Sequence, residues 1–231
     1  MDGILLFNKP ILWTSHDAVD FLRRKLGQKS VGHAGTLDPM ATGLLVMLVG
    51  KCTKLSADLS GLDKDYYGSL ILGLATDTQD LEGKIITTAD PSAVGQALLE
   101  RTLGELTGAQ TQAPPAYSAA KKDGKKMYQW ARQGVAMQAK TRDITVKEFR
   151  LLRFTGPEAT FFLTCSKGTY VRTLCDAVGR RLGCGATLSS LVRSRVGEFR
   201  LDDALDRAAI EDLSPAVIEK KMVAGRAASL R

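Results

Sequence analysis

Apolar and polar residues follow two periods along this chain, one typical of strands and one typical of helices. Residues 44–49 form a continuous apolar run, which predicts a strand buried on both faces. Between residues 15 and 26 the apolar positions recur every three or four residues, and Gly27 follows them. We therefore expect a helix there, with Ser15 as its N-cap. The same period predicts a helix over residues 169–182.

The remaining pattern is an irregular mixture of shorter elements. Further strands are expected at residues 4–7, 66–74, 85–88, 143–154, 159–166 and 188–199, and further helices at 92–103 and 127–132. Helices and strands do not alternate in a regular β-α-β order, so the pattern predicts an α+β fold with a mixed or antiparallel sheet. With 231 residues, of which 44% are apolar, the chain can bury a substantial core.

The positive charge of the chain is concentrated in one segment. The sequence has 32 basic and 25 acidic residues, a net charge of +7. Residues 120–153 hold ten basic and three acidic residues, and the rest of the chain is balanced at 22 of each. A localised basic segment is typical of a protein that binds a polyanion, with nucleic acid as the first candidate and an acidic membrane surface as the second. A solvated charged face is the alternative.

Several classes of protein are excluded or disfavoured by what the sequence lacks. No window approaches an uncharged apolar membrane span, and the first residues do not form a secretion signal, so we expect a cytoplasmic protein. The four cysteines form no Cys-x-x-Cys pair and there are two histidines, so no metal site is predicted. Gly50-Lys51 is followed by Cys52, and the earlier glycine of a phosphate-binding loop is missing, which argues against a nucleotide cofactor.

One loop is built to orient a carboxylate. Residues 31–43 hold a single acid, Asp38, among several glycines and directly before Pro39. Glycine permits backbone angles closed to other residues, while Pro39 fixes its own φ and favours an extended Asp38. Asp38 is therefore a candidate nucleophile. Asp-Pro near glycines is also an ordinary turn signal, and the loop alone does not decide between the two interpretations.

Four sequence blocks resemble the TruB family of tRNA pseudouridine synthases over residues 3 to 199. The blocks follow one another in the family's order and at its spacing. They are residues 31–43 with their flanks; Lys64-Asp65-Tyr66 with Thr76-Asp77-Thr78 and Glu82-Gly83; Gln112, Pro114-Pro115 and Tyr117-Ser118-Ala119 with Lys121 and Arg132; and Lys167-Gly168-Thr169-Tyr170-Val171-Arg172 with residues 182–186 and Arg195-Val196-Gly197.

The resemblance implies the pseudouridine synthase fold, a curved mixed or antiparallel central sheet flanked by helices with an RNA-binding cleft. It implies a single catalytic domain over residues 1–231, with a basic thumb-like insertion at about residues 115–142. The short tail at about 202–231 is too short for the PUA-type domain that often follows in relatives, so none is expected. We expect a monomer.

The resemblance also implies the reaction and its main residues. The T-loop uridine of tRNA, uridine 55, would be isomerised to pseudouridine without cofactor, metal or membrane, and the T-arm stem-loop would be the RNA partner. Asp38 would be the nucleophile, at C6 of the base, at C1′ of the sugar or in a glycal route. Arg172 would pair with this carboxylate, and Tyr66 would stack on the flipped base. The alternative function is an RNA-binding protein or tRNA chaperone with an inactive pocket.

The other candidate site residues are implied by the same resemblance. His33 matches a histidine that fills the space left by the flipped base, Tyr170 a second pocket tyrosine and Leu191 an apolar pocket wall. Four cations match basic positions of the family, where phosphate contacts and structural ion pairs are both possible. They are Lys9, Lys64, Lys121 and Arg132.

The chain departs from the family at Leu12. Relatives usually have a glycine two residues after the Lys-Pro pair, whereas Lys9-Pro10 is followed by Ile11 and Leu12. A leucine would be strained if that glycine uses a positive φ, so we expect the turn to be altered here.

Overall fold

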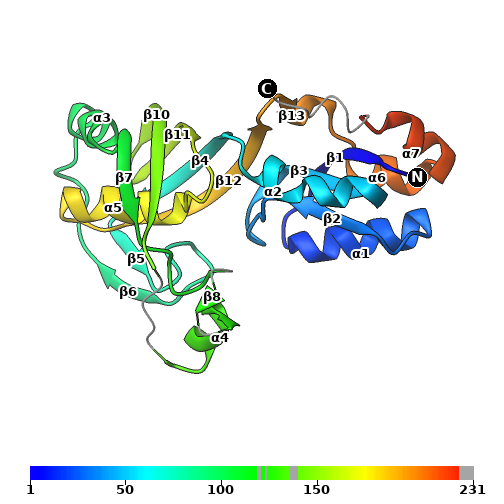
Figure 1. Cartoon of the computed structure of the whole chain (residues 1–231). Coiled ribbons are helices and arrows are strands. Elements are labelled where there is room, and N and C mark those ends of the chain that lie inside the picture. Colours follow the sequence, from blue (N-terminus) through cyan, green and yellow to red (C-terminus); the bar gives the residue numbers. More distant parts are fainter. Residues whose placement is uncertain (119–120, 123, 136–139, 224–231) are drawn as a thin grey trace. The chain divides into compact units, whose positions relative to one another are not determined.

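The computed structural model describes residues 1–118, 121–122, 124–135 and 140–223, and the chain divides into two compact units (Figure 1). Unit 1 comprises residues 1–66 and 191–231, and unit 2 comprises residues 67–190. The chain passes between the units within strands β4 (Lys64–Leu72) and β12 (Ala186–Val196). Unit 1 is thus assembled from two separate stretches of sequence, and the single catalytic domain over residues 1–231 stays a prediction.

Unit 1 is built around strand β3 (Thr42–Val49), in which every residue except Thr42 is buried. The strands β1 (Gly3–Lys9) and β2 (Val31–Ala34) pair antiparallel with β3, and Val192 and Arg193 of β12 pair with it in parallel. This confirms the expectation of a strand covered on both faces and of a mixed sheet. Helices α1 (Ser15–Leu26) and α2 (Ser56–Ser60), the latter preceded by the 3₁₀-helix η1 (Gly50–Leu55), pack against β2.

The C-terminal segment is part of unit 1. It contains strand β13 (Phe199–Arg200), 3₁₀-helix η2 (Leu201–Asp203) and helices α6 (Arg207–Asp212) and α7 (Pro215–Lys221). Leu205 forms a parallel bridge to Phe7, and Val223 an antiparallel bridge to Ile4. Two backbone hydrogen bonds join Val223 and Ile4, with N···O distances of 2.8 and 3.0 Å. The predicted tail is therefore attached along β1.

Unit 2 contains the other strands of the main sheet. Its strand order is β12–β4–β11–β10–β7, and β10 (Arg142–Thr155) pairs antiparallel with both β11 (Glu158–Cys165) and β7 (Gly108–Gln112). Helices α3 (Gln96–Glu105) and α5 (Val171–Leu182) contact one another, and α3 also packs on β10. Strands β5 (Leu74–Thr76) and β6 (Ile85–Thr88) form a separate antiparallel pair. The α+β class is confirmed.

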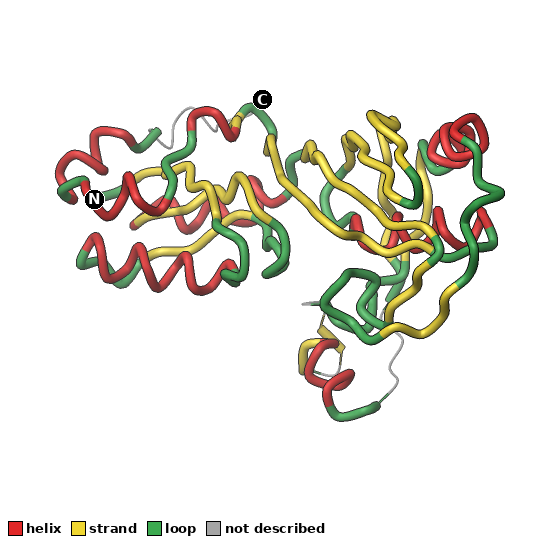
Figure 2. The backbone as a smooth tube through the Cα atoms, turned by 180° about the vertical axis from the view of Figure 1, so that it is seen from behind, coloured by secondary structure: helices red, strands yellow, loops and turns green. Residues whose placement is uncertain are grey.

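A small hairpin and a short helix lie within the basic segment of unit 2. Strands β8 (Lys121–Lys122) and β9 (Lys125–Lys126) pair antiparallel and lead into α4 (Met127–Arg132), as expected for residues 127–132. In Figure 1 and Figure 2 the hairpin and α4 lie outside the main sheet of unit 2 and are connected to it by loops. That it acts as a thumb on RNA stays a prediction. No helix in the described ranges is both long and apolar enough to cross a membrane.

Several element boundaries differ from those predicted. Thr14, not Ser15, caps α1, through a capping box with Asp17. The predicted helix at Ser92 begins only at Gln96, because Ser92 is engaged by the carboxylate of Asp90 through both its amide and its hydroxyl. The predicted strand over 66–74 is interrupted at Gly73, where φ is 84°.

Candidate active site

Asp38 lies in the loop that joins β2 to β3, where it is half-buried. Gly35 and Gly43 bracket this loop with φ of 90° and 97°, a conformation that L side chains rarely adopt. A side chain at Gly43 would also clash with the backbone of Arg193. The carbonyl of Asp38 accepts a hydrogen bond from the Ala41 amide at 3.1 Å, which closes the turn. The glycines thus allow the tight approach that the sequence predicts.

The residues on either side of Asp38 are hydrogen-bonded to the segment that precedes α1. The Ser15 hydroxyl donates to the Leu37 carbonyl at 3.1 Å and accepts from the Leu37 amide at 2.9 Å. On the other side, the Leu12 amide donates to the Pro39 carbonyl at 2.9 Å. Ser15, expected as a helix cap, is instead a buried brace of the Asp38 loop. Such bracing from both sides restricts the backbone that carries the candidate nucleophile.

A buried arginine holds the base of the same loop. Arg193 of β12 is 1% exposed. Its Nε donates to the carbonyl of Leu44 at 2.7 Å, and its two terminal nitrogens donate to the carbonyls of Gly35 and Thr36 at 3.0 and 3.4 Å. Within the described residues, no carboxylate lies within ion-pair distance of this guanidinium. Arg193 therefore connects both ends of the Asp38 loop through backbone carbonyls.

Lys9 and Lys64, expected as cations near the RNA, are buried, with exposed fractions of 0% and 6%. The Lys9 ammonium donates to the carbonyls of Pro10 and Trp13 at 2.9 and 2.6 Å, and approaches the Pro39 carbonyl at 3.5 Å. The Lys64 ammonium donates to two carbonyls of the turn before β4, at 2.7 and 2.5 Å. Both ammonium groups thus support backbone turns, at residues 9–13 and 60–62, and a contact of either lysine with RNA stays a prediction.

Leu12 has the strained backbone conformation that a leucine at this position was expected to risk, and an altered turn relative to the family stays a prediction. Its φ is 68°, in the left-handed region, and its side chain is 75% exposed. This conformation costs a residue with a Cβ about 1–2 kcal/mol. In this conformation its amide donates the hydrogen bond to the Pro39 carbonyl.

Tyr66 and Tyr67 lie on opposite faces of β4. Tyr66 is 7% exposed, whereas Tyr67 is 48% exposed and its ring contacts that of Phe162 at a centroid distance of 5.2 Å. Next to Tyr66, Asp65 forms a two-pronged ion pair with Arg195 of β12, with N···O distances of 2.5 and 2.7 Å. This hydrogen-bonded ion pair raises the pKa of Arg195. The pair joins β4 to β12 next to the buried Tyr66.

His33 and Leu191 are the other site residues in unit 1. Leu191 is buried in β12. His33 pairs with Met47 of β3, and its Nδ1 is buried without a hydrogen-bond partner among the described residues. Burial lowers the pKa of His33, with a smaller contribution from the positive charge of Arg193, so the imidazole is neutral at pH 7. A neutral, unsatisfied ring is compatible with the space-filling role that the resemblance implies, which stays a prediction.

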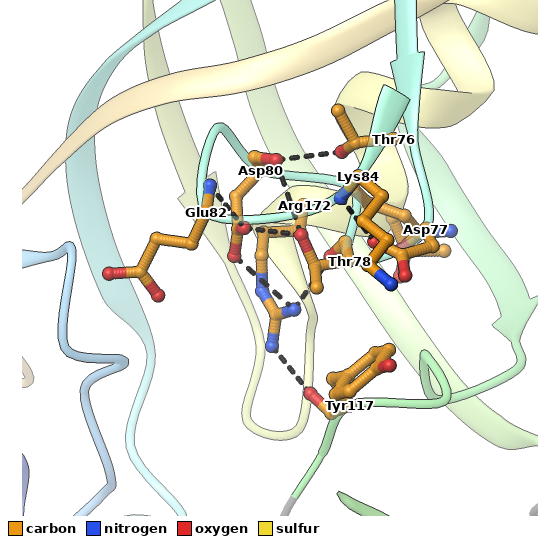
Figure 3. Close-up of polar contacts among 10 residues, drawn as sticks. Thr76, Asp77, Thr78, Asp80, Glu82, Lys84, Tyr117 and Arg172 are labelled. Carbon is orange, nitrogen blue, oxygen red and sulfur yellow. Dashed lines mark hydrogen bonds and ion pairs between the residues drawn. The ribbon is translucent and has the colours of Figure 1, made fainter. Parts of the chain in front are cut away.

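In unit 2, Arg172 is held by a polar network (Figure 3). It is the second residue of α5 and is 4% exposed. The guanidinium lies 3.5 Å from a carboxylate oxygen of Asp80 and donates to the carbonyls of Thr78 and Tyr117 at 2.7 and 2.9 Å. A cation at a helix N-terminus opposes the helix dipole, and the Asp80 carboxylate offsets this cost.

The loop that carries Asp80 is itself tightly fixed. Asp80 accepts hydrogen bonds from the Thr78 hydroxyl at 2.5 Å and from the Glu82 amide at 3.1 Å (Figure 3). Gln79 adopts a left-handed φ of 66°, and its side chain binds Thr173 of α5. The residues flanking Gln79 thus supply two of the groups that contact Arg172, the Thr78 carbonyl and the Asp80 carboxylate.

Tyr170 is the N-cap residue of α5, and Gln112 of β7 holds its backbone. The Gln112 amide side chain accepts from the Tyr170 amide at 2.7 Å and donates to its carbonyl at 3.2 Å. The guanidinium of Arg142 lies 5.9 Å from the centre of the Tyr170 ring. The backbone of Tyr170 is therefore anchored to β7, next to the start of the basic strand β10.

The basic segment presents exposed cations near aromatic rings. The ammonium of Lys125, an exposed side chain, lies 4.7 Å from the centre of the Trp130 ring. The backbones of Lys121 and Arg132 belong to β8 and α4, but their side chains lie outside the described part of the chain. Their expected RNA contacts stay predictions. All four cysteines are free and buried, and the described residues contain no acid, cysteine or histidine cluster that could hold a metal.

Sequence reasoning missed three residues that position the site. Asp80 lies between the Thr76-Asp77-Thr78 and Glu82-Gly83 motifs. The sequence feature that could have indicated its role is that it is a second carboxylate close to Asp77 in a short loop. Arg193 lies two residues after the apolar Leu191 in a strand, at a position where the alternation predicts a buried side chain. An arginine there indicates a structural role, because a buried guanidinium needs acceptors for several N–H donors. Ser15 gave a misleading signal, since a serine before an amphipathic helix is normally a cap.

Family models match nearly the whole chain. Residues 23–171 match the model of the TruB family pseudouridylate synthase (N terminal domain), and residues 172–226 match that of the tRNA pseudouridylate synthase B C-terminal domain. A protein of Opitutus terrae named tRNA pseudouridine synthase B is 47% identical over 223 residues, covering 96% of this chain and 92% of the relative. A protein of the same name from Syntrophotalea carbinolica is 46% identical, over 93% of this chain and 70% of the relative.

Solved structures agree in fold. A chain from the crystal structure of a Cbf5-Nop10-Gar1 complex superposes with a TM-score of 0.75 at 24% identity, covering 98% of this chain. This protein spans 61% of the length of that chain. A chain from an archaeal box H/ACA sRNP Nop10-Cbf5 complex gives a TM-score of 0.70 at 22% identity. Together with the family models and the relatives, these matches confirm the resemblance: the chain belongs to the TruB family of pseudouridylate synthases.

Proposed function

We propose that this protein isomerises uridine 55 in the T-loop of tRNA to pseudouridine, with Asp38 as nucleophile. Relatives at 41–47% identity carry the name tRNA pseudouridine synthase B. The observation that carries the proposal is the Asp38 loop, in which Ser15, Leu12 and Arg193 brace the backbone on three sides of one half-buried carboxylate. A reaction that needs one well-oriented nucleophile needs such a loop.

The reaction requires no external group. The N1–C1′ glycosidic bond breaks, the uracil turns, a C5–C1′ bond forms, and the proton lost from C5 is balanced by one gained at N1. An ionised Asp38 attacks C6 or C1′, or assists a glycal route; all three need the carboxylate charged. Arg172 stabilises that charged form in our proposal, and the Asp80 network keeps its guanidinium oriented.

The target uridine has to leave its stack before Asp38 can reach it, at a cost of a few kcal/mol. We propose that Tyr66 stacks on the flipped base, with Tyr170 and Leu191 as further pocket walls. Stacking of this kind contributes about 1–3 kcal/mol per base. His33, neutral and without a partner for its Nδ1, would fill the space that the base leaves.

The basic segment is the proposed contact for the phosphates of the T-arm. Lys121 and Arg132 belong to it, and the excess charge of the chain is concentrated there. We propose that the protein acts as a monomer in the cytoplasm.

The test is conversion of a T-arm stem-loop transcript, with chemical mapping of the isomerised position. Wild-type protein is expected to convert one uridine of the T-loop, uridine 55, and Asp38→Asn is expected to lose conversion while it retains RNA binding. The matched control is Asp58→Asn, an exposed acid of α2 in the same unit, which is expected to keep wild-type turnover. RNA binding by the wild type without any conversion would favour an RNA-binding protein with an inactive pocket. Full turnover by Asp38→Asn would exclude the mechanism.

A further inference from the structure

Leu12 lowers stability without gaining burial. Its φ of 68° is one that glycine adopts freely, and asparagine more readily than leucine. Its side chain is 75% exposed, so it does not repay the strain by packing into unit 1. Strained residues cluster at ligand-binding and active sites. Glycine would form the same turn and the same amide hydrogen bond without strain, so it is the leucine side chain that calls for a role outside the fold itself.

The turn at Leu12 is attached to the candidate nucleophile's loop. The Leu12 amide donates to the carbonyl of Pro39, the residue after Asp38, at 2.9 Å. From inside the turn, the Lys9 ammonium binds the carbonyls of Pro10 and Trp13. Ile11, next to Leu12, is 59% exposed. Two adjacent exposed apolar side chains are thus held in a fixed position one hydrogen bond away from the Asp38 loop.

We infer that Leu12, together with Ile11, is an apolar contact for the RNA substrate and binds the unpaired nucleotides next to the target uridine. The identity of this RNA rests on the proposed function. A nucleotide that reaches Asp38 brings its neighbours close to a turn bonded to Pro39. Extrusion of the target exposes the faces of neighbouring bases, and leucine and isoleucine are among the side chains that cover or wedge such unstacked steps. An apolar contact of this kind adds affinity that does not depend on phosphate charge.

Two substitutions separate the side chain of Leu12 from its backbone. Leu12→Gly relieves the strain, and Leu12→Asn keeps the size and tolerates the turn but removes the apolar surface. Both variants are expected to unfold at the wild-type temperature or above it. Both are expected to bind a fluorescently labelled T-arm stem-loop about fivefold to tenfold more weakly, which is the effect of losing one apolar contact. Ile11→Ser is expected to weaken binding in the same direction.

Salt dependence distinguishes this contact from a phosphate contact. The slope of log Kd against log salt reports the number of phosphates neutralised, so it is expected to stay the same in Leu12→Gly and Leu12→Asn. The matched control is Val217→Asn, an exposed valine of α7 in the same unit and outside the basic segment, which is expected to keep wild-type affinity.

The inference is overturned if both Leu12 variants bind the stem-loop within about twofold of wild type, or if the salt slope changes with them. If the variants bind RNA as wild type does but no longer associate with a second copy of the chain, Ile11 and Leu12 form a protein contact and not an RNA contact. Because binding is measured without turnover, the result is independent of the reaction. A wild-type protein that binds in a Leu12-dependent way but converts no uridine would contradict the proposed function and leave this inference standing.

Discussion

The two units each bury an arginine, and the two guanidiniums are held in different ways. Arg193 in unit 1 donates to three backbone carbonyls, those of Gly35, Thr36 and Leu44. Arg172 in unit 2 lies against the buried carboxylate of Asp80 as well as two carbonyls. The first arrangement fixes a loop, because carbonyl positions define the path of the backbone. The second fixes a charge, because a carboxylate offsets the cost of burying a cation.

This difference separates two requirements of the proposed reaction. The nucleophile's loop needs accurate placement, which unit 1 provides through hydrogen bonds to Leu37, Pro39 and the carbonyls around them. The guanidinium of Arg172 needs to stay charged and oriented, which unit 2 provides through the Asp80 carboxylate and the carbonyls of Thr78 and Tyr117. Substitutions in the two units should therefore fail in different ways.

The largest effect is expected for Asp80→Asn, which leaves the buried Arg172 without its carboxylate. Removing one partner of a buried ion pair costs about 3–5 kcal/mol of unfolding free energy. Displacement of Arg172 is also expected to lower turnover by about 100-fold. Denaturant unfolding and single-turnover conversion of a T-arm transcript measure the two effects. Asp77→Asn, in the same loop, is the control, since its carboxylate accepts from the exposed Lys84 amide. A loss below about 1 kcal/mol for Asp80→Asn would show that the carbonyls alone hold Arg172.

A smaller effect on stability is expected for Arg193→Met. The variant leaves buried carbonyls without donors but also removes a buried charge, so the net cost is about 1–3 kcal/mol. Because the Asp38 loop loses its anchor, kcat is expected to fall about tenfold while KM for the RNA changes little. Arg193→Lys keeps the charge but not the planar fork of donors, and is expected to restore only part of kcat. Full recovery by lysine would mean that charge, and not loop geometry, is what Arg193 contributes.

Salt dependence is expected to distinguish the cations of the two units. Lys125→Gln in the basic segment should weaken RNA binding and reduce the slope of log Kd against log salt by about 1. Lys51→Gln, an exposed lysine of unit 1, serves as the control and should leave the slope unchanged. Equal reductions in both variants would contradict the assignment of phosphate contacts to the basic segment.

The smallest effect is expected from His33. Burial lowers its pKa below the ordinary value of 6.5, so the unfolded chain takes up a proton more readily than the folded one. Stability from this group is therefore present above pH 6.5 and lost as the pH falls below that value. Thermal unfolding between pH 5 and 8 should show a shallower acid loss in His33→Gln than in wild type. An identical pH profile in the variant would contradict a depressed pKa.

The elements with a strong apolar period were predictable, and those defined by tertiary pairing were not. The central strand β3, helix α1 and helix α5 follow from their periodicity. Strand β7 was missed because its sequence, Gly108-Ala109-Gln110-Thr111-Gln112, has no apolar alternation and becomes a strand by pairing with β10. Strand β2 was missed because its four residues were interpreted as part of a glycine-rich loop.

The parts of the candidate site that could be predicted are single residues that stand out in their local sequence. Asp38 is conspicuous in its loop, and Arg172 lies at the predicted helix start. The supporting contacts were not predictable, because Ser15 and Arg193 reach the Asp38 loop over sequence separations of 22 and more than 150 residues. Lys9 and Lys64 show the same limit, since the sequence gives their charge but not their burial.

The bridges from Leu205 and Val223 to β1 impose an order on biosynthesis. Unit 2 is a continuous stretch, residues 67–190, so all of it has been synthesised before residues 191–223 are added. Unit 1 can pair β12 with β3, and Val223 with Ile4, only once those last residues emerge. Until then β1 has an edge that the C-terminal segment does not yet cover. Arg193, which anchors the Asp38 loop, thus becomes available only after the whole of unit 2 has been synthesised.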